Sequence, residues 1–446
     1  MPFGAAREPS LSLRLTRAGV RDTARAERLL ASPALVALLP DAASRLPDHL
    51  GDTADPDLAL LSLVTLAEAV ADDPRSAAGL AQALVGDEVA RTRLLAVLGA
   101  SSALGNVLAA HPHALAVVLD PEPGTGVSVD VVRAELLRAV GADPDSPVPV
   151  AGMQGSAGVD AMRLAYRTRL LRIAASDLTS VEPLTRLPAT AAALADLAAA
   201  ALEASLALAR ADLPDHGRGV RLSVIGMGKA GGRELNYVSD VDVIYVAEPV
   251  DGTDEDAALA IGARLAAGLA RACSTASGEP ALWPVDAALR PEGKNGPLVR
   301  TLASHRAYYE RWASTWEFQA LLKARPLAGD VGLGRAYVQM VQPMVWAAVG
   351  RENFVEDAQA MRRRVEQNVP RAEADRQIKL GVGGLRDVEF TVQLLQLVHG
   401  RADESIRSGS TLTALAALAA GGYVGRDHAA QLAVCYRFLR LVEHRV

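Results

Sequence analysis

Two aspartates, Asp240 and Asp242, stand at the start of a run rich in β-branched residues, and a third, Asp286, lies in a later candidate strand at 282–289. Side chains at positions i and i+2 leave a strand on one face, so Asp240 and Asp242 present their carboxylates side by side while Val241 and Val243 pack behind them. Mg²⁺ prefers carboxylate oxygens together with the phosphate oxygens of a substrate, and paired ions can clamp the attacking and leaving oxygens of an in-line displacement. The spacing therefore predicts a magnesium site, with Asp286 supplying a third carboxylate from a neighbouring strand.

A glycine-rich segment, Gly226 to Gly232, comes shortly before these aspartates. Its glycines match Gly-x-Gly-x-x-Gly after a predicted strand, which is the dinucleotide-binding fingerprint. Only seven residues separate the last glycine from the first aspartate, too few for the crossover of a dozen or more that joins parallel strands. A P-loop is also disfavoured, because Lys229 precedes an alanine rather than Ser or Thr. We therefore predict a turn in which Gly231 and Gly232 let backbone N–H groups approach nucleotide phosphates.

The structural alternative is that Asp240 and Asp242 only cap an edge strand and that the glycines form an ordinary tight turn. The presence of the glycine pair, Ser239 and Asp286 together favours the catalytic interpretation.

Lysine is scarce in this chain, since the 46 basic residues include only four lysines and hence 42 arginines. A lysine that persists against such a bias is expected where a compact ammonium is needed, as at phosphates, although chance survival is the alternative. Arg290 is predicted to lie within reach of a phosphate, because it follows Asp286 by four residues. The candidate nucleotide- and phosphate-binding residues are Gly231, Gly232, Ser239, Lys229, Arg233, Arg290, Lys294, Lys323, Lys379 and Arg386.

Two of these candidates rest on weaker patterns. Lys323 lies at the end of a predicted helix that holds two tryptophans, and an ordinary amphipathic helix explains this pattern equally well. Glycines 381, 383 and 384 precede Arg386 and a predicted helix, whose free N–H groups and positive dipole end favour an anion. Lys379 and Arg386 would reinforce such a phosphate site, and a plain loop-to-helix junction is the alternative.

The elements that must position these residues are predicted to be mainly helical, because half of the residues are hydrophobic and only 4% are aromatic. Leu, Ala and Val recur at helical spacing from residue 11 to about 119 and again after Pro297, and no internal repeat is found. Short runs rich in β-branched residues lie between these regions. The predicted strands cover 220–225, 240–246 and 282–289, and the predicted helices cover 163–177, 188–211, 308–324, 352–368, 385–399, 411–420 and 429–446.

Stretches 120–126 and 141–158 are rich in Pro, Gly, Asp and Ser and indicate loops near a boundary. We predict an N-terminal helical region at 1–160, a catalytic domain at 161–303 and a C-terminal helical domain at 304–446. The last predicted helix has no Gly or Pro stop signal, so we expect a longer protein that is cut within this helix.

The charge and the cysteine content exclude several classes of protein. The formal net charge is −6 and the pI is about 5.8, which disfavours a nucleic-acid partner. Two cysteines, Cys273 and Cys435, cannot form a disulfide framework or a zinc cluster, which suits a reducing cytoplasm. The N-terminus has no apolar signal region, and the most apolar stretch, 189–210, is interrupted by Asp196 and Glu203. We therefore expect a cytoplasmic protein with no membrane segment.

The segment Gly-Met-Gly-Lys-Ala-Gly-Gly-Arg-Glu-Leu-Asn-Tyr-x-Ser-Asp-x-Asp, residues 226–242, resembles the signature of the glutamine synthetase adenylyltransferase/adenylyl-removing family, which lies within the DNA polymerase β-like nucleotidyltransferases. Further matching motifs lie at 171–178, 286–293, 316–325 and 378–390. The resemblance is clear from about residue 160 onward and fainter before it. It implies an α+β fold that is predominantly α, with a mixed sheet between an N-terminal helical region and a C-terminal helical bundle.

Members of this family carry two nucleotidyltransferase halves, of which the first removes AMP from glutamine synthetase and the second attaches it. The N-terminal helical region, and Asn236 where the second half more often has Gly, resemble the adenylyl-removing half. The resemblance implies that orthophosphate attacks the α-phosphorus of an adenylyl-tyrosine and releases ADP. A second half and a PII-type signalling protein are the further partners that it suggests.

The resemblance assigns Asp240 and Asp242 to Mg²⁺, as two ions for which Mn²⁺ can substitute, and Asp286 to the second ion or to orienting the incoming phosphate. Orthophosphate is already anionic, and tyrosine, with a pKa of about 10, is a tolerable leaving group, so no histidine or cysteine base is required. One alternative is adenylyl transfer from ATP to a protein tyrosine or a small molecule. Another is a non-catalytic regulatory module that only binds nucleotide.

Overall fold

The computed structural model describes residues 9–122, 124–250, 252–352, 354–367, 370 and 376–446. The chain divides into two compact units, the first made of residues up to 126 together with 167–186, and the second of 127–166 together with 187–446. Two long helices, α12 (Gly155–Leu178) and α13 (Pro183–Ala211), contribute residues to both units. The domain boundaries at 160/161 and 303/304 stay a prediction.

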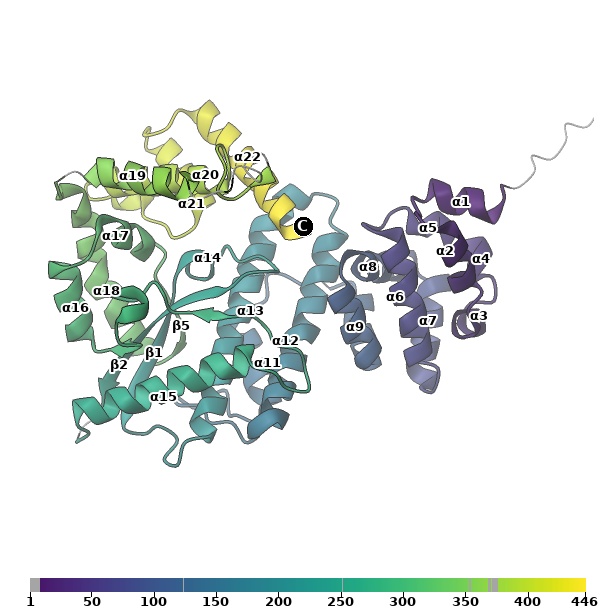
Figure 1. Cartoon of the computed structure of the whole chain (residues 1–446), viewed down its shortest axis with the longest axis horizontal. Helices are drawn as coiled ribbons and strands as arrows, with labels where there is room; N and C mark the ends of the chain where they lie inside the picture. The colour runs from purple at the N-terminus through teal and green to yellow at the C-terminus, as the bar shows by residue number, and fades with distance from the viewer. Residues whose placement is uncertain (1–8, 123, 251, 353, 368–369, 371–375) are drawn as a thin grey trace, which may run out of the picture. The chain divides into compact units, whose positions relative to one another are not determined.

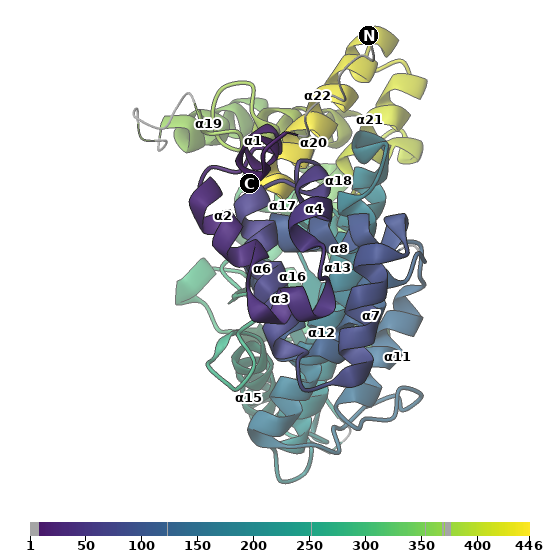
Figure 2. The same cartoon turned by 90° about the vertical axis from the view of Figure 1, so that its right-hand side faces the viewer.

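The first unit is largely a set of short helices (Figure 2), several of which begin at a polar cap. The side chains of Asp55 and Asp73 each accept a hydrogen bond from a backbone N–H of the first turn, and a proline follows each of them. The Asp-Pro pairs thus begin helices. The helices of this unit are α1 (Leu11–Arg17), α2 (Thr23–Leu30), α3 (Pro33–Leu38), α4 (Ala42–Arg45), α5 (Pro47–Leu50), α6 (Pro56–Ala69), α7 (Pro74–Val85), α8 (Glu88–Ala100), α9 (Ser102–Ala110) and α10 (Leu115–Leu119).

A small mixed sheet forms the centre of the second unit (Figure 1). Strands β1 (Val220–Gly226) and β2 (Val241–Pro249) are antiparallel, and β5 (Arg325–Gly329) pairs antiparallel with the other edge of β1. Strands β3 (Val285–Asp286) and β4 (Val299–Arg300) pair parallel with β2. The antiparallel β1–β2 pair excludes a dinucleotide-binding βαβ crossover at this glycine segment, as its short length predicts.

Helices cover both faces of this sheet. Helix α15 (Glu255–Ser274) packs on β1 and β2, where Gly262 lies so close to the sheet that an added Cβ would be 3.3 Å from Ala247. On the other face, α16 (Leu302–Arg311), α17 (Thr315–Leu321) and α18 (Val331–Ala347) share an apolar core with Ile225 and Ile244. Because helices pack on both faces of β1 and β2, most residues of these strands are buried, although Arg221 is exposed.

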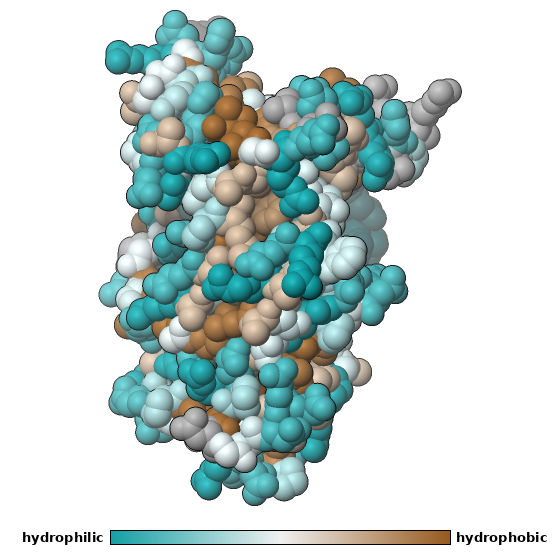
Figure 3. All heavy atoms as spheres, turned by 90° about the vertical axis from the view of Figure 1, so that its left-hand side faces the viewer, coloured by the Kyte–Doolittle hydropathy of each residue, from teal (hydrophilic) through white to brown (hydrophobic). Residues whose placement is uncertain are grey.

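The second unit also contains α11 (Val129–Ala139) and, after the sheet, α19 (Phe354–Gln367), α20 (Leu385–His399), α21 (Thr411–Ala420) and α22 (Arg426–Arg445). The last three helices share small apolar clusters, and Figure 1 shows them together at the C-terminal end. In the view of Figure 3, apolar residues lie in small separate areas between polar ones.

The predictions for 385–399 and 411–420 are confirmed residue for residue, and the strands at 220–225 and 240–246 are confirmed within a few residues. The single helix predicted at 308–324 is wrong, because Ser314 and Glu317 form a capping box that starts α17 and residues from Arg325 form β5. Within the expected strand at 282–289, only β3 (Val285–Asp286) is a strand. Helices α15 and α18 were not predicted, and residue 368 lies outside the described residues.

Two described helices, α13 and α15, have the length and apolar composition of a membrane span. Helices α8 and α9, which are bent by 117° relative to each other, also have this length and composition when they are taken together. In this fold 89% of the apolar window of α13 is buried inside the protein. The two carboxylates that interrupt α13 are also buried, with Asp196 beside Arg233 and Glu203 accepting the N–H of Gly329 at 2.6 Å.

Candidate active site

Three carboxylates meet at one end of the sheet. Asp242 lies on β2 directly opposite Asp286 on the parallel strand β3, and Asp240 precedes β2 by one residue. Oxygen atoms of Asp240, Asp242 and Asp286 all lie within 4.8 Å of one another, and Val241 and Val243 are buried behind them. The arrangement that the sequence predicted for these residues is thus present in the fold.

The carboxylate of Asp242 is held in a crowded and partly buried position. Burial, with the nearby charges of Asp240 and Asp286, raises its pKa from 3.8 to about 6. Gly228, at a φ of +50°, lies so close that an added Cβ would be 2.4 Å from an Asp242 oxygen. A divalent cation fits this donor set, because it would relieve the repulsion among three oxygen-donating carboxylates.

The glycine segment forms a short helical turn, α14 (Gly228–Gly231), between β1 and β2. The N–H of Gly231 donates to the carbonyl of Met227, and the N–H of Gly232 donates to the carbonyl of Gly228. These two N–H groups are therefore engaged within the turn. Gly231 has a steric role as well, since an added Cβ would be 2.0 Å from the carbonyl oxygen of Lys323.

A cavity of about 290 Å³ opens beside the carboxylates. Its walls come from the glycine turn, the start of β2, α17, α19 and α20. Of the predicted site residues, it is lined by Lys229, Ser239, Asp240, Asp242, Lys323, Lys379 and Arg386. The described residues that line it include no histidine and no cysteine.

Lys379 and Arg386 reach this cavity by their side chains. The expectation of free N–H groups at the start of α20 is wrong, because the N–H groups of Leu385 and Arg386 donate to the carbonyls of Ile378 and Lys379. Both cations lie near enough to Asp242 to act against the rise in its pKa. Positive charge therefore faces the carboxylates across the cavity.

Lys229 is tied to the C-terminal helix. Its ammonium donates to Asn236 at 2.9 Å and to Glu443 of α22 at 2.5 Å. Burial and the nearby Arg440 lower its pKa from 10.5 to about 8, although Glu443 acts in the opposite direction. Lys229 thus lies at the cavity wall with its charge already paired.

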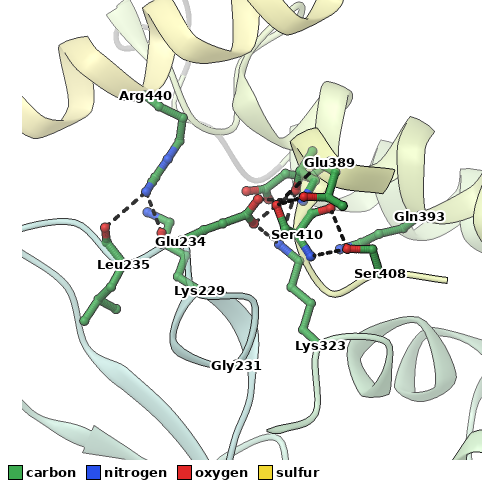
Figure 4. Close-up of polar contacts among 12 residues, drawn as sticks. Lys229, Gly231, Glu234, Leu235, Lys323, Glu389, Gln393, Ser408, Ser410 and Arg440 are labelled. Carbon is green, nitrogen blue, oxygen red and sulfur yellow. Dashed lines mark hydrogen bonds and ion pairs between the residues drawn. The ribbon is translucent and has the colours of Figure 1, made fainter. Parts of the chain in front are cut away.

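Lys323 forms a buried ion pair at the base of the cavity (Figure 4). Its ammonium donates to Glu234 at 2.6 Å, and the other carboxylate oxygen of Glu234 accepts the N–H of Thr411 at 2.6 Å. Burial alone would lower the pKa of Lys323, but Glu234 and Glu389 outweigh it and raise the pKa. Arg440 reaches from α22 to the carbonyls of Glu234 and Leu235, as Figure 4 shows.

The structure places the other predicted phosphate ligands outside the cavity lining. Arg233 forms a two-point ion pair with Asp196 of α13. Arg290 donates to the carbonyls of Ala287, Lys294 and Gly296 and so shapes its own loop. Lys294 lies in the same loop.

Sequence reasoning missed several residues of this site. The segment that follows α14 is held by the side chains of Glu234 and Asn236 within it and by those of Arg440 and Glu443 on α22. The hydrogen-bond partners are up to 214 residues apart in the chain. The cavity residues Gln319 and Gln393 were also missed, although the spacing of Arg386, Glu389 and Gln393 on one helical face was a signal available in the sequence.

A mixed sheet that gathers three carboxylates beside a glycine turn and a cation-lined cavity defines the catalytic domain of a nucleotidyltransferase. The family model described as glutamate-ammonia ligase adenylyltransferase matches residues 91–340, more than half of the chain. Residues 359–446 match the model of the GlnD PII-uridylyltransferases. The chain belongs to the glutamate-ammonia ligase adenylyltransferase family.

Its curated relatives are bifunctional glutamine synthetase adenylyltransferase/adenylyl-removing enzymes. Those of Streptomyces avermitilis and Streptomyces coelicolor are each 54% identical over 99% of this chain, and that of Cutibacterium acnes is 49% identical over 99%. The chain spans 42%, 42% and 44% of the length of these three relatives.

Proposed function

We propose that this chain removes AMP from an adenylyl-tyrosine of glutamine synthetase by phosphorolysis. Orthophosphate forms a bond to the α-phosphorus, the bond to the tyrosine oxygen breaks, and ADP and free tyrosine leave. The observation that carries this proposal is the cluster of Asp240, Asp242 and Asp286 beside a cavity lined by cations. The names of the relatives include the adenylyl-removing activity.

Asp240, Asp242 and Asp286 would hold Mg²⁺, as two ions for which Mn²⁺ can substitute. When bound, these ions supply positive charge to the phosphate oxygens in the transition state. Lys379 and Arg386 bind the orthophosphate or the phosphate of the adenylyl group from the α20 side of the cavity. No residue has to act as a general base, because orthophosphate is already anionic.

The choice of AMP removal over AMP attachment rests on the N-terminal helical region and on Asn236. The family resemblance places Asn236 where the attaching half more often has Gly. In this fold the Asn236 side chain accepts the Lys229 hydrogen bond and donates to the carbonyl of Val238. We therefore assign the residue a part in fixing Lys229 beside the turn.

The partners that follow are adenylylated glutamine synthetase, orthophosphate, ADP and a second nucleotidyltransferase half. The match to the PII-uridylyltransferases over 359–446 supports a PII-type signalling protein as a regulator. We propose that the reaction takes place in the cytoplasm, where Cys273 and Cys435 stay free as they are here.

The test is to mix the chain with adenylylated glutamine synthetase, Mg²⁺ and orthophosphate and to measure ADP. ADP formation should require orthophosphate and rise with its concentration to saturation. AMP release at an undiminished rate without phosphate would instead make the protein a hydrolase. Pyrophosphate release from ATP would indicate adenylyl transfer, and nucleotide binding without any turnover would indicate a regulatory module.

A further inference from the structure

The cavity beside the carboxylates is also lined by residues that the phosphate chemistry does not use. Two of them are glutamines, Gln319 of α17 and Gln393 of α20, and Gln319 is nearly buried. The apolar residues of the lining are Leu289, Trp316, Ala320, Met361 and Phe390.

Helix α20 runs along the cavity. Arg386, Glu389 and Gln393 are spaced at i, i+3 and i+7 and all line it, so one face of the helix forms a wall. Seven residues of helix correspond to about 10 Å. Arg386 acts on Asp242, and Gln393 lies two turns further on, near the Lys323 cluster in Figure 4. A nucleotide that lies along this face with its phosphate at Arg386 would bring its base to Gln393.

The two amides are joined to each other. The amide nitrogen of Gln319 donates to the carbonyl oxygen of Gln393 at 2.8 Å. Each glutamine amide carries one acceptor oxygen and two N–H donors, and among the described residues the Gln319 oxygen and the Gln393 nitrogen have no hydrogen-bond partner. The pair thus offers one acceptor and one donor to a ligand. Adenine presents the matching set, an amino donor next to a ring-nitrogen acceptor.

Aromatic surfaces accompany the amides. The Arg386 guanidinium lies over the Phe390 ring, 5.6 Å from the ring centroid, and Trp316 is 36% exposed while lining the cavity. Nucleic-acid bases stack on such aromatic rings. A planar base therefore has both an apolar surface and a polar edge in this part of the cavity.

We propose that Gln319 and Gln393 form the base-reading pair of this site and select adenine through its 6-amino group and an adjacent ring nitrogen. This inference rests on the proposed function, because it assumes that the phosphate of an adenine nucleotide lies at the carboxylates.

The test measures the affinity of the full chain, with Mg²⁺, for ADP, for purine riboside 5′-diphosphate and for UDP by calorimetry. Purine riboside diphosphate lacks only the 6-amino group, so it should bind about tenfold more weakly than ADP. Gln319→Met should bind ADP about tenfold more weakly and lose this preference, because the Gln319 oxygen accepts from the 6-amino group. Its affinity for purine riboside diphosphate should change little, which also shows that it folds. Gln393→Met should weaken the binding of ADP and of purine riboside diphosphate about equally, because both keep the ring nitrogen.

Gln339→Met is the matched control, because Gln339 is exposed on α18 and does not line the cavity. Wild-type selectivity retained in Gln319→Met, or unchanged ADP affinity in Gln393→Met, would overturn the inference, as would tighter binding of UDP than of ADP. A chain that releases ADP from adenylylated glutamine synthetase while both variants bind nucleotides as the wild type does refutes the base-reading pair alone. A chain that shows glutamine-dependent ADP binding without turnover refutes the proposed function alone.

Discussion

Replacing Asp242 by Asn should stabilise the metal-free protein and abolish its activity at the same time. The folded state raises the pKa of this carboxyl from 3.8 to about 6, so above pH 7 the ionised form destabilises the fold by about 3 kcal/mol. Asparagine removes this cost and also removes a metal-binding oxygen. We expect the thermal midpoint in EDTA at pH 8 to rise by a few degrees and AMP removal to fall on the order of 100-fold or more.

The pH dependence of this stabilisation gives a sharper test. The folded wild-type protein binds the Asp242 proton more tightly than the unfolded chain does, so the cost grows between pH 3.8 and about 6 and is constant above. The difference in midpoint between Asp242→Asn and wild type should therefore shrink at pH 4 to a small fraction of its value at pH 8. Asp212→Asn, at an exposed position, is the control. An Asp242→Asn protein that melts at or below the wild-type temperature at pH 8, or that turns over normally, would refute the three-carboxylate site.

Three further predictions concern the cations. Because the pKa of Lys229 is about 8, turnover should decline above that pH in the wild type, and Lys229→Arg should be slower but lack this decline in its pH–rate profile. Arg233→Ala should lower the free energy of unfolding by about 1–3 kcal/mol by leaving Asp196 poorly paired, and a changed KM for orthophosphate would contradict this structural role. Lys323→Met should lower the free energy of unfolding by about 3–5 kcal/mol in urea. Adding Glu234→Gln should recover part of this free energy, and no recovery would argue against the buried pair.

The carboxylate cluster could be predicted because it depends on short sequence patterns. The alternation of Asp240, Val241 and Asp242 fixes which face of a strand the carboxylates take, and the short connection from the glycine turn requires an antiparallel pair. The third carboxylate, Asp286, followed from the same chemistry, and the parallel pairing of β2 with β3 provides it.

The surroundings of the site could not be predicted in the same way. The sequence does not reveal in which direction the long Arg233 side chain extends. Its ion pair with Asp196, which only the fold brings close, turns Arg233 away from the cavity. The ion pair of Lys323 with Glu234 joins residues 89 positions apart. Strand β5 begins immediately after a helical pattern and contains Pro326, which the edge position of the strand tolerates.

The contacts of α22 with the segment after α14 are expected to couple the stability of two distant parts of the chain. Arg440 donates hydrogen bonds to two backbone carbonyls of this segment, and Glu443 accepts one from Lys229. We therefore expect local unfolding of the last turns of α22 to release the glycine turn without disturbing the central sheet. Amide hydrogen exchange should detect residues 229–236 and 436–445 as one cooperative unit, with protection lower than that of β1 and β2.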